Sequence, residues 1–282
     1  MVAILGGLGA ALVFATTTLC SSRSTRMIGA GPVLAWVMIV GLLITGPVIA
    51  VEGRPANLDA GALGWLAVSG VGNVLGLLLA YGGLRLGQVG VVAPIVSTEG
   101  AIAAVISVLA GERLAPGVGV TLGVIAIGIL LAAFPGDDQP LIAPRPGRAA
   151  ILAVGAAFSF GVSLYATGHV GTKLPVFWAL FPARIVGVVA IAIPLVLTSR
   201  LRLTKRALPL VMTSGVCEVA GFALFTIGAR HGLAVSAVLA SQFAAIAALV
   251  AFVLFRERLL RVQLVGVVTI VAGVAVLAVL QA

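Results

Sequence analysis

Three ionisable residues stand inside long apolar stretches, where a charge is unexpected. Glu99, Arg184 and Glu218 each fall near the middle of a run more than 20 residues long that has no other charge. An ionisable side chain at mid-bilayer costs on the order of 2.5–3.5 kcal/mol on insertion scales, so it generally faces a protein interior or a wet cavity. Our hypothesis is that Glu99 or Glu218 exchanges protons, and that Arg184 binds a carboxylate or phosphate. The alternatives are a structural ion pair and a protonated Glu that is hydrogen-bonded between helices.

The elements that must hold these residues are membrane-spanning helices. Of the 282 residues, 25 are charged and 61% are hydrophobic, whereas roughly 25% of residues in soluble domains are charged. Seven stretches without Asp, Glu, Lys or Arg exceed 20 residues, which is the length that a spanning helix needs. Counting the three interrupted stretches, we predict an all-α polytopic membrane protein with ten transmembrane helices. The predicted spans are 2–20, 31–51, 60–82, 88–110, 116–134, 149–169, 174–198, 207–229, 233–255 and 262–280.

The two halves of the chain resemble each other at an offset of 145 residues. The most informative matches involve residue types that are rare in an apolar chain: Ser69 with Ser214, Arg85 with Arg230, and Glu112-Arg113 with Glu257-Arg258. Each copy holds five spans, an odd number, so the second copy must enter the membrane from the opposite side. We therefore predict two inverted five-helix repeats, 1–134 and 149–282, joined by a linker at 135–148, with a binding site near mid-membrane between them.

The repeat strengthens the case for Glu218. Its equivalent is Asn73, so both positions are polar, and glycines stand three residues before and after each of them. The flanking glycines lie on the same helix face as the polar residue, and small residues mark faces where membrane helices approach closely. We therefore expect Asn73 and Glu218 to point inward. Glu99 and Arg184 have apolar equivalents, so a mechanism that uses their charges must be asymmetric.

The repeats and their motifs resemble the EamA family of the drug/metabolite transporter superfamily. The resemblance rests on ten spans in two repeats, with Gly-Glu-Arg-Leu at 111–114 and Arg-Glu-Arg-Leu at 256–259, and it covers nearly the whole chain. It implies export or exchange of a small metabolite by alternating access. Because the family includes carriers for amino acids, nucleotide sugars and other solutes, the resemblance does not name a substrate. For the Glu-Arg pairs themselves, we expect helix ends anchored at the interface, with a gate as the alternative.

Other residues in the spans are weaker candidates for the site. Gln242 is the repeat equivalent of Ser97, and Ser241 precedes it. Tyr165 can stack on a solute, although aromatic residues near span ends are more often interfacial anchors. The remaining candidates are Trp36, Trp178, the threonines 16–18 at the end of the first span, and Pro94 as a kink before Glu99.

The basic excess and the cysteines indicate no further chemistry. The net charge is +9, and 16 of the 17 basic residues fall in short loops or at span ends. There they set topology and meet lipid headgroups, so we expect no nucleic acid partner. Cys20 and Cys217 lie in or at the end of apolar spans and suggest neither a disulfide framework nor a metal site. The sequence has no metalloprotease or phosphate-loop motif, so we expect no cofactor, no metal and no coupling to ATP.

The charge distribution leaves the orientation open. Loops after odd-numbered predicted spans carry 12 basic residues and those after even-numbered spans carry four, which by the positive-inside rule places both termini outside. The family is more usually drawn with both termini inside.

Together these features predict a carrier for a small organic solute, secondary active (with protons as a candidate coupling ion) or facilitative, and not an enzyme. Its partners would be the solute, the lipid bilayer and, under the proton hypothesis, protons. We expect a multi-pass protein of the plasma (inner) membrane that is a monomer, with a homodimer as the alternative. The rival classes are an enzyme acting within the membrane and a channel or structural membrane protein.

Overall fold

The protein is all-helical over the residues that its computed structural model describes, which are 1–87, 89–132, 146–246 and 261–280. No strand occurs within these ranges. The helices are α1 (Val2–Ile28), α2 (Ala30–Glu52), α3 (Ala60–Leu86), α4 (Val89–Val96), α5 (Glu99–Leu109), α6 (Val118–Ala132), α7 (Pro146–Gly171), α8 (Val176–Gly187), the π-helical turn η1 (Val188–Ala192), α9 (Ile193–Leu197), α10 (Leu208–Ala229), α11 (Leu233–Ala240) and α13 (Arg261–Leu280).

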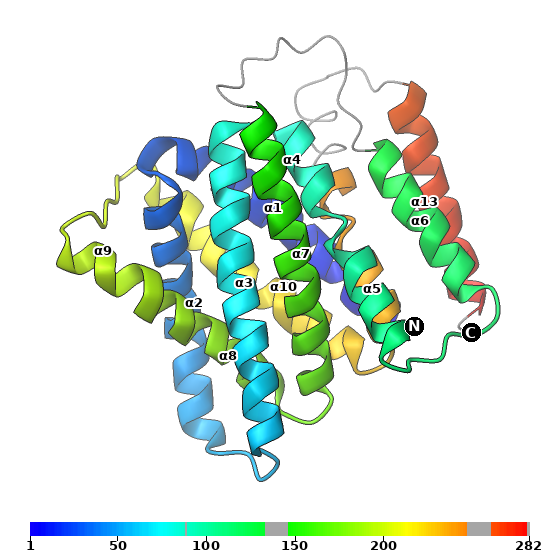
Figure 1. Ribbon diagram of the computed structural model, residues 1–282, viewed down its shortest axis with the longest axis horizontal. Coiled ribbons are helices and arrows are strands. Elements are labelled where there is room, and N and C mark those ends of the chain that lie inside the picture. Colours follow the sequence, from blue (N-terminus) through cyan, green and yellow to red (C-terminus); the bar gives the residue numbers. More distant parts are fainter. Residues whose placement is uncertain (88, 133–145, 247–260, 281–282) are drawn as a thin grey trace.

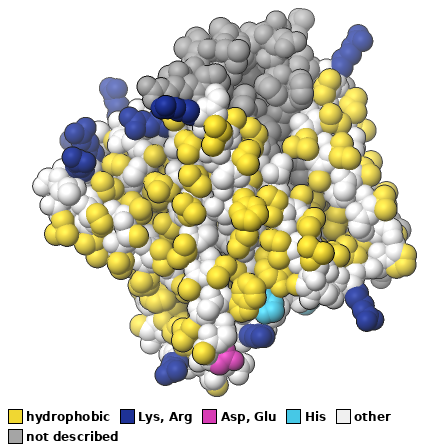
Figure 2. Space-filling model, viewed as in Figure 1, with side chains coloured by type: hydrophobic (Ala, Val, Ile, Leu, Met, Phe, Trp, Pro, Cys, Tyr) yellow, Lys and Arg dark blue, Asp and Glu magenta, His cyan; other side chains and the backbone are white. Residues whose placement is uncertain are grey.

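The lengths and compositions of the helices are those of a multi-pass membrane protein. Six of the described helical stretches are long and apolar enough to span a membrane, and three shorter apolar helices accompany them. Figure 2 shows the corresponding surface: hydrophobic side chains cover the middle of this face, and Lys and Arg gather toward its ends. The prediction of a polytopic all-α membrane protein is confirmed. The count of ten spans stays a prediction, because three of the predicted spans are shorter helices here and part of the chain is not described.

One predicted span is broken near its middle. The stretch 88–110 forms α4 and α5, with Ser97 and Thr98 in a turn between them. The N–H of Thr98 donates to the carbonyl of Ile95, three residues back, at 3.2 Å, and its hydroxyl donates to the same oxygen at 2.8 Å. Pro94 in α4 has no N–H of its own to donate. The predicted span is therefore interrupted just after Pro94, the residue named above as a kink, because local hydrogen bonds replace the helical ones.

A second break occupies the equivalent place in the other half. α11 ends at Ala240, and Ser241 and Gln242 form a turn before the chain resumes a helical course to residue 246. The N–H of Gln242 donates to the carbonyl of Leu239, again three residues back, at 3.2 Å. Discontinuous helices at equivalent points of two repeats are a feature of solute-binding regions in secondary transporters. The described part of the predicted span 233–255 is thus interrupted by this turn.

The two halves of the chain are interleaved. The most extensive packing is between α1 and α10 and between α3 and α7. The first helix of each half therefore packs on the third helix of the other half. α6 and α13, the last helix of each half, lie side by side at one edge of the bundle (Figure 1). This pattern is unchanged when the halves are exchanged, which is what a pseudo-two-fold relation requires.

Paired glycines allow this interleaving. Gly221 of α10 lies against the ring of Phe14 of α1, and Gly76 of α3 lies against the ring of Phe160 of α7. A Cβ added to either glycine would collide with that ring. Gly76 and Gly221 are repeat equivalents, so the same ring-on-glycine contact is used twice to bring the helices together.

Candidate functional site

The centre of the site is a contact between two equivalent positions of the repeat. Asn73 of α3 donates from Nδ2 to Oε1 of Glu218 of α10 at 3.3 Å, and each residue is 2% exposed. The two residues are 145 apart in the sequence. A residue that touches its own equivalent must lie close to the pseudo-two-fold axis. Both side chains point inward, as the flanking glycines predicted.

Arg184 of α8 reaches the same carboxylate. Its Nη1 lies 3.8 Å from Oε1 of Glu218. This is the one ion pair among the described residues. Arg184 is 1% exposed, and its Nη1 also donates to the sulfur of Met38 at 3.7 Å. A Cβ at Gly41 of α2 would come within 2.6 Å of Cδ of Arg184. The glycine therefore makes the room that the long side chain needs to reach Glu218.

Two polar atoms in this cluster have no hydrogen-bond partner among the described residues: Oδ1 of Asn73 and Nε of Arg184. A buried polar group without a partner is costly, typically about 1–3 kcal/mol. One acceptor and one donor beside Glu218 therefore remain available for a water or a solute.

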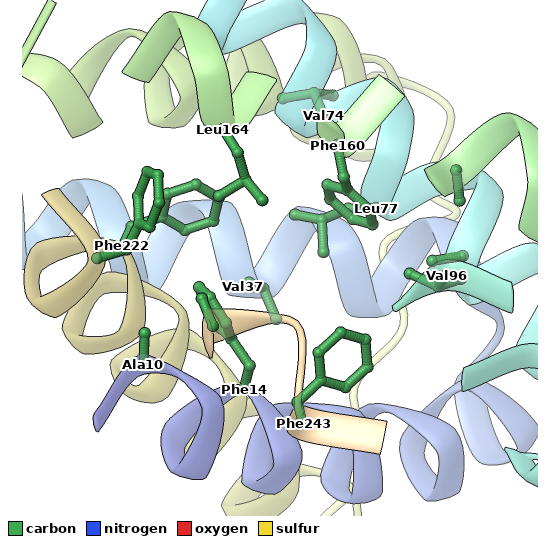
Figure 3. Packing of buried hydrophobic residues seen from close by; sticks show 14 of the residues in the cluster. Ala10, Phe14, Val37, Val74, Leu77, Val96, Phe160, Leu164, Phe222 and Phe243 are labelled. Atoms are coloured by element: carbon green, nitrogen blue, oxygen red, sulfur yellow. The ribbon is translucent and has the colours of Figure 1, made fainter. Parts of the chain in front are cut away.

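A cavity opens beside Glu218 and is walled from both halves of the chain. The centre of a water molecule can occupy about 70 Å³ of it. Most of the lining is apolar, and four phenylalanines contribute to it from α1, α7, α10 and the segment after α11; Figure 3 shows these rings converging on one space. They are Phe14, Phe160, Phe222 and Phe243. The polar lining side chains are those of Thr17, Thr18, Tyr81, Glu99 and Glu218.

Glu99 faces the cavity because the broken helix places it there. It is the first residue of α5, directly after the turn at Ser97-Thr98, and it is 6% exposed. The N-terminus of a helix presents unpaired N–H groups and a partial positive charge, which favour a carboxylate. Among the described residues, Arg184 is paired with Glu218, and no basic side chain is paired with Glu99.

Ser241 and Gln242 lie at the second break, next to α5. Both are buried, and the hydroxyl of Ser241 donates to the carbonyl of Val238 at 2.9 Å. A Cβ at Gly100 would come within 2.5 Å of the Ser241 hydroxyl, so the two broken helices touch beside Glu99. Nε2 of Gln242 has no hydrogen-bond partner within the described part of the chain. The two breaks therefore face each other across the repeats.

Tyr165 belongs to a different place. Its ring lies 5.6 Å from that of Trp65 and 5.9 Å from that of His169, and it lines a second, more open cavity with Glu112 and Arg230. This cavity lies away from the two carboxyls of the first. Trp36 and Trp178 are also elsewhere: their indole N–H groups donate to backbone carbonyls of a loop residue and a helix cap, Arg202 and Gly53.

Glu112 makes a contact between the halves that the sequence did not indicate. Its carboxylate accepts hydrogen bonds from the hydroxyl of Ser107 and, at 3.1 Å, from the backbone N–H of Ala234 in the first turn of α11. The first motif glutamate thus caps a helix of the second half. The equivalent pair Glu257-Arg258 lies outside the described residues.

Sequence reasoning missed the aromatic lining of the cavity. A signal for part of it exists, because Phe14 and Phe160 are 146 residues apart, one residue off the offset of the other matches. An alignment of the halves with a one-residue gap would have paired them. Phe222, Phe243 and Tyr81 have no such signal.

Within the described part of the chain, no group of three or more His, Cys, Asp or Glu side chains is placed to hold a metal ion. Cys20 and Cys217 are free thiols.

Comparisons with known proteins bear on both halves of the chain. A family model described as the EamA-like transporter family matches residues 1–134 and 147–279. A crystal structure of another protein superposes with a TM-score of 0.76 over 99% of this chain and 97% of its own, at 18% sequence identity. At that identity the likeness shows the fold alone. No curated protein sequence matches significantly.

Proposed function

Because the chain belongs to the EamA-like transporter family, we propose that it carries a small organic solute across a membrane by alternating access. In this proposal the solute binds in the cavity that Glu99 and Glu218 line. The observation that carries the proposal is the position of this cavity: its walls come from both halves, beside the Asn73–Glu218 contact near the pseudo-two-fold axis.

A site near such an axis suits alternating access. Two inverted repeats related by an axis in the membrane plane can exchange conformations, and this exchange opens the same site first to one side and then to the other. The two helix breaks beside Glu99 supply half-helix ends, which can bind polar groups at membrane depth. A motion of one half against the other would therefore act directly on the bound solute.

The carboxyls are the proposed coupling groups. Glu99 and Glu218 are buried and line the cavity. None of the described residues that line the cavity is basic. Each carboxyl can accept a proton when the solute leaves. Arg184 is not part of the cavity lining, so in this proposal it positions Glu218 by their ion pair instead of binding an anionic solute.

Transport across vesicles tests this function. Purified protein in sealed vesicles is screened with small solutes, with and without a pH gradient, and read for saturable uptake and counterflow. A carrier gives both. Flux that rises linearly without saturation would instead indicate a channel, and conversion of a solute in detergent micelles, where no second compartment exists, would indicate an enzyme.

Substitution of the carboxyls tests the coupling. We expect Glu218→Gln and Glu99→Gln to lower uptake at least tenfold or to abolish its dependence on the pH gradient. Glu52→Gln, at the exposed end of α2, serves as a control that keeps both. A pH dependence that survives both substitutions would contradict proton coupling through these residues.

The setting of the carrier is also a proposal. We propose a monomer in the plasma (inner) membrane, since two repeats in one chain complete the pseudo-symmetric unit. Tags at each terminus, tested for accessibility in intact cells, decide between termini outside and termini inside. The mass of the purified protein, corrected for bound detergent, distinguishes a monomer from a homodimer.

A further inference from the structure

We infer that the solute is an organic cation with an apolar or aromatic body, held beside Glu99. The inference rests on the proposed function, because it assigns the substrate class of the same cavity. It comes from the charges and rings that line the cavity.

Among the described residues, the site has one more carboxyl than it has basic groups. The described residues at the cavity and its edge include two carboxyls, Glu99 and Glu218, and one guanidinium, that of Arg184, which lies 3.8 Å from Glu218. A buried charge needs a partner, because its desolvation is otherwise uncompensated. The Glu218–Arg184 pair is neutral as a unit. One cation, either a proton or a positively charged solute, would therefore balance the charge of the Glu99 carboxylate.

The walls favour the organic cation. Phe14, Phe160, Phe222 and Phe243 surround the space, and Tyr81 faces it. The faces of aromatic rings carry partial negative charge and attract cations, with about 0.5–2 kcal/mol gained per contact depending on desolvation. The rest of the lining is apolar and suits a hydrophobic body. An anionic group would meet two carboxyls.

The surroundings of Glu99 make proton and solute competitors for one group. Glu218 faces it from α10 with its partner Arg184 from α8, and Tyr81 faces the cavity from α3. α4 and α11 have no titratable residue, and α7 contributes Phe160 and Leu164 to the lining. Binding of the cation therefore requires that Glu99 has released its proton, which makes the cation and the proton alternate occupants.

Three probes that share a phenethyl group test the charge requirement. Phenethyltrimethylammonium is a permanent cation, 2-phenylethanol is neutral, and 3-phenylpropionate is an anion at neutral pH. Binding to the purified full chain in detergent is measured by calorimetry. We expect saturable binding of the cation at least tenfold tighter than that of the other two. Its affinity should fall as the pH is lowered, because the charge of the probe does not change and only the protein can gain the competing proton.

Variants locate the cation. Glu99→Gln should weaken binding of the cation at least tenfold and remove its pH dependence, and Glu52→Gln should leave both unchanged. Thermal unfolding checks that each variant is folded. If Glu99→Gln does not fold, Glu99→Asp keeps the charge and should keep the preference for the cation. Equal affinity for the three probes, or cation binding unchanged by Glu99→Gln, would overturn the inference.

Counterflow separates this inference from the function it rests on. Saturable counterflow of neutral or anionic solutes, without any of cations, would overturn the cation assignment and leave the carrier intact. Cation binding that depends on Glu99 but is never accompanied by counterflow would support the site and overturn the carrier.

Discussion

Asn73 and Glu218 occupy equivalent positions of the repeat and are hydrogen-bonded to each other, Nδ2 to Oε1, at 3.3 Å. At a pseudo-two-fold axis the two equivalent side chains meet, so the residue type that fits at one position depends on the residue at the other. Two glutamates at this distance would repel when both are ionised, whereas an amide donates to a carboxylate. The difference between the halves at this position thus turns an unfavourable pair into a hydrogen bond, and leaves one carboxylate at the axis for Arg184.

Introducing a second carboxyl at the axis should make stability depend on pH. Asn73→Asp replaces a donor to Glu218 with a like charge when both are ionised. We expect its loss of stability relative to the unchanged protein to grow as the pH rises, because the repulsion requires both charges. Asn73→Ala, which only removes the hydrogen bond, should cost about 1 kcal/mol when Glu218 is ionised, and its loss should change less with pH. Unfolding midpoints across a pH series measure the difference, and parallel curves for both variants would contradict it.

Arg184 and Glu218 should behave as a coupled pair. Glu218→Gln alone leaves a buried guanidinium without its partner, and Arg184→Met alone leaves a buried carboxylate, so each should cost on the order of 3–5 kcal/mol. The double variant should recover most of that loss, since no buried charge is left uncompensated. A double-mutant cycle of unfolding free energies in detergent measures the coupling. Additive effects would mean that the ion pair, at 3.8 Å, does not contribute.

The ring-on-glycine contacts predict which glycines tolerate a methyl group. Gly76→Ala and Gly221→Ala place a Cβ against Phe160 and Phe14, and overpacking of this kind typically costs about 1–3 kcal/mol. Gly46→Ala in α2 is the matched control, because nothing lies within 4 Å of its added Cβ. Thermal unfolding compares the three. The equivalence of the two contacts predicts similar losses at Gly76 and Gly221; a large loss at Gly46 would show that helix strain, not ring packing, is measured.

Glu112 should behave as a helix cap that joins the halves. Its carboxylate accepts from the N–H of Ala234 at 3.1 Å, so Glu112→Ala removes a cap, at a typical cost of about 0.5–2 kcal/mol. Glu112→Gln retains an accepting oxygen and should lose less. Hydrogen exchange of the first turn of α11, measured by mass spectrometry, should rise in Glu112→Ala. Unchanged exchange there would contradict a capping role.

Much of the architecture was predictable because the bilayer imposes simple rules on a sequence. The lengths of the charge-free runs indicated helices that span a membrane, and the matches at an offset of 145 residues indicated two repeats. The flanking glycines indicated that Asn73 and Glu218 face inward. These inferences depend on composition and on helical spacing, which are local properties of the chain.

Contacts between distant residues were decided only by the tertiary structure. Helical spacing places Asn73 and Glu218 on inner faces, but only the packing of α3 on α7 and of α10 on α1 brings these two side chains together. Arg184 is added from α8. The breaks beside Glu99 and Gln242 arise where side-chain hydroxyls and the turn compete with helical hydrogen bonds, and apolar composition does not report that competition. The aromatic cavity likewise draws Phe14, Phe160 and Phe222 from three helices. The spacing of residues along one helix shows which face of that helix is buried, whereas a site depends on how several helices pack against one another.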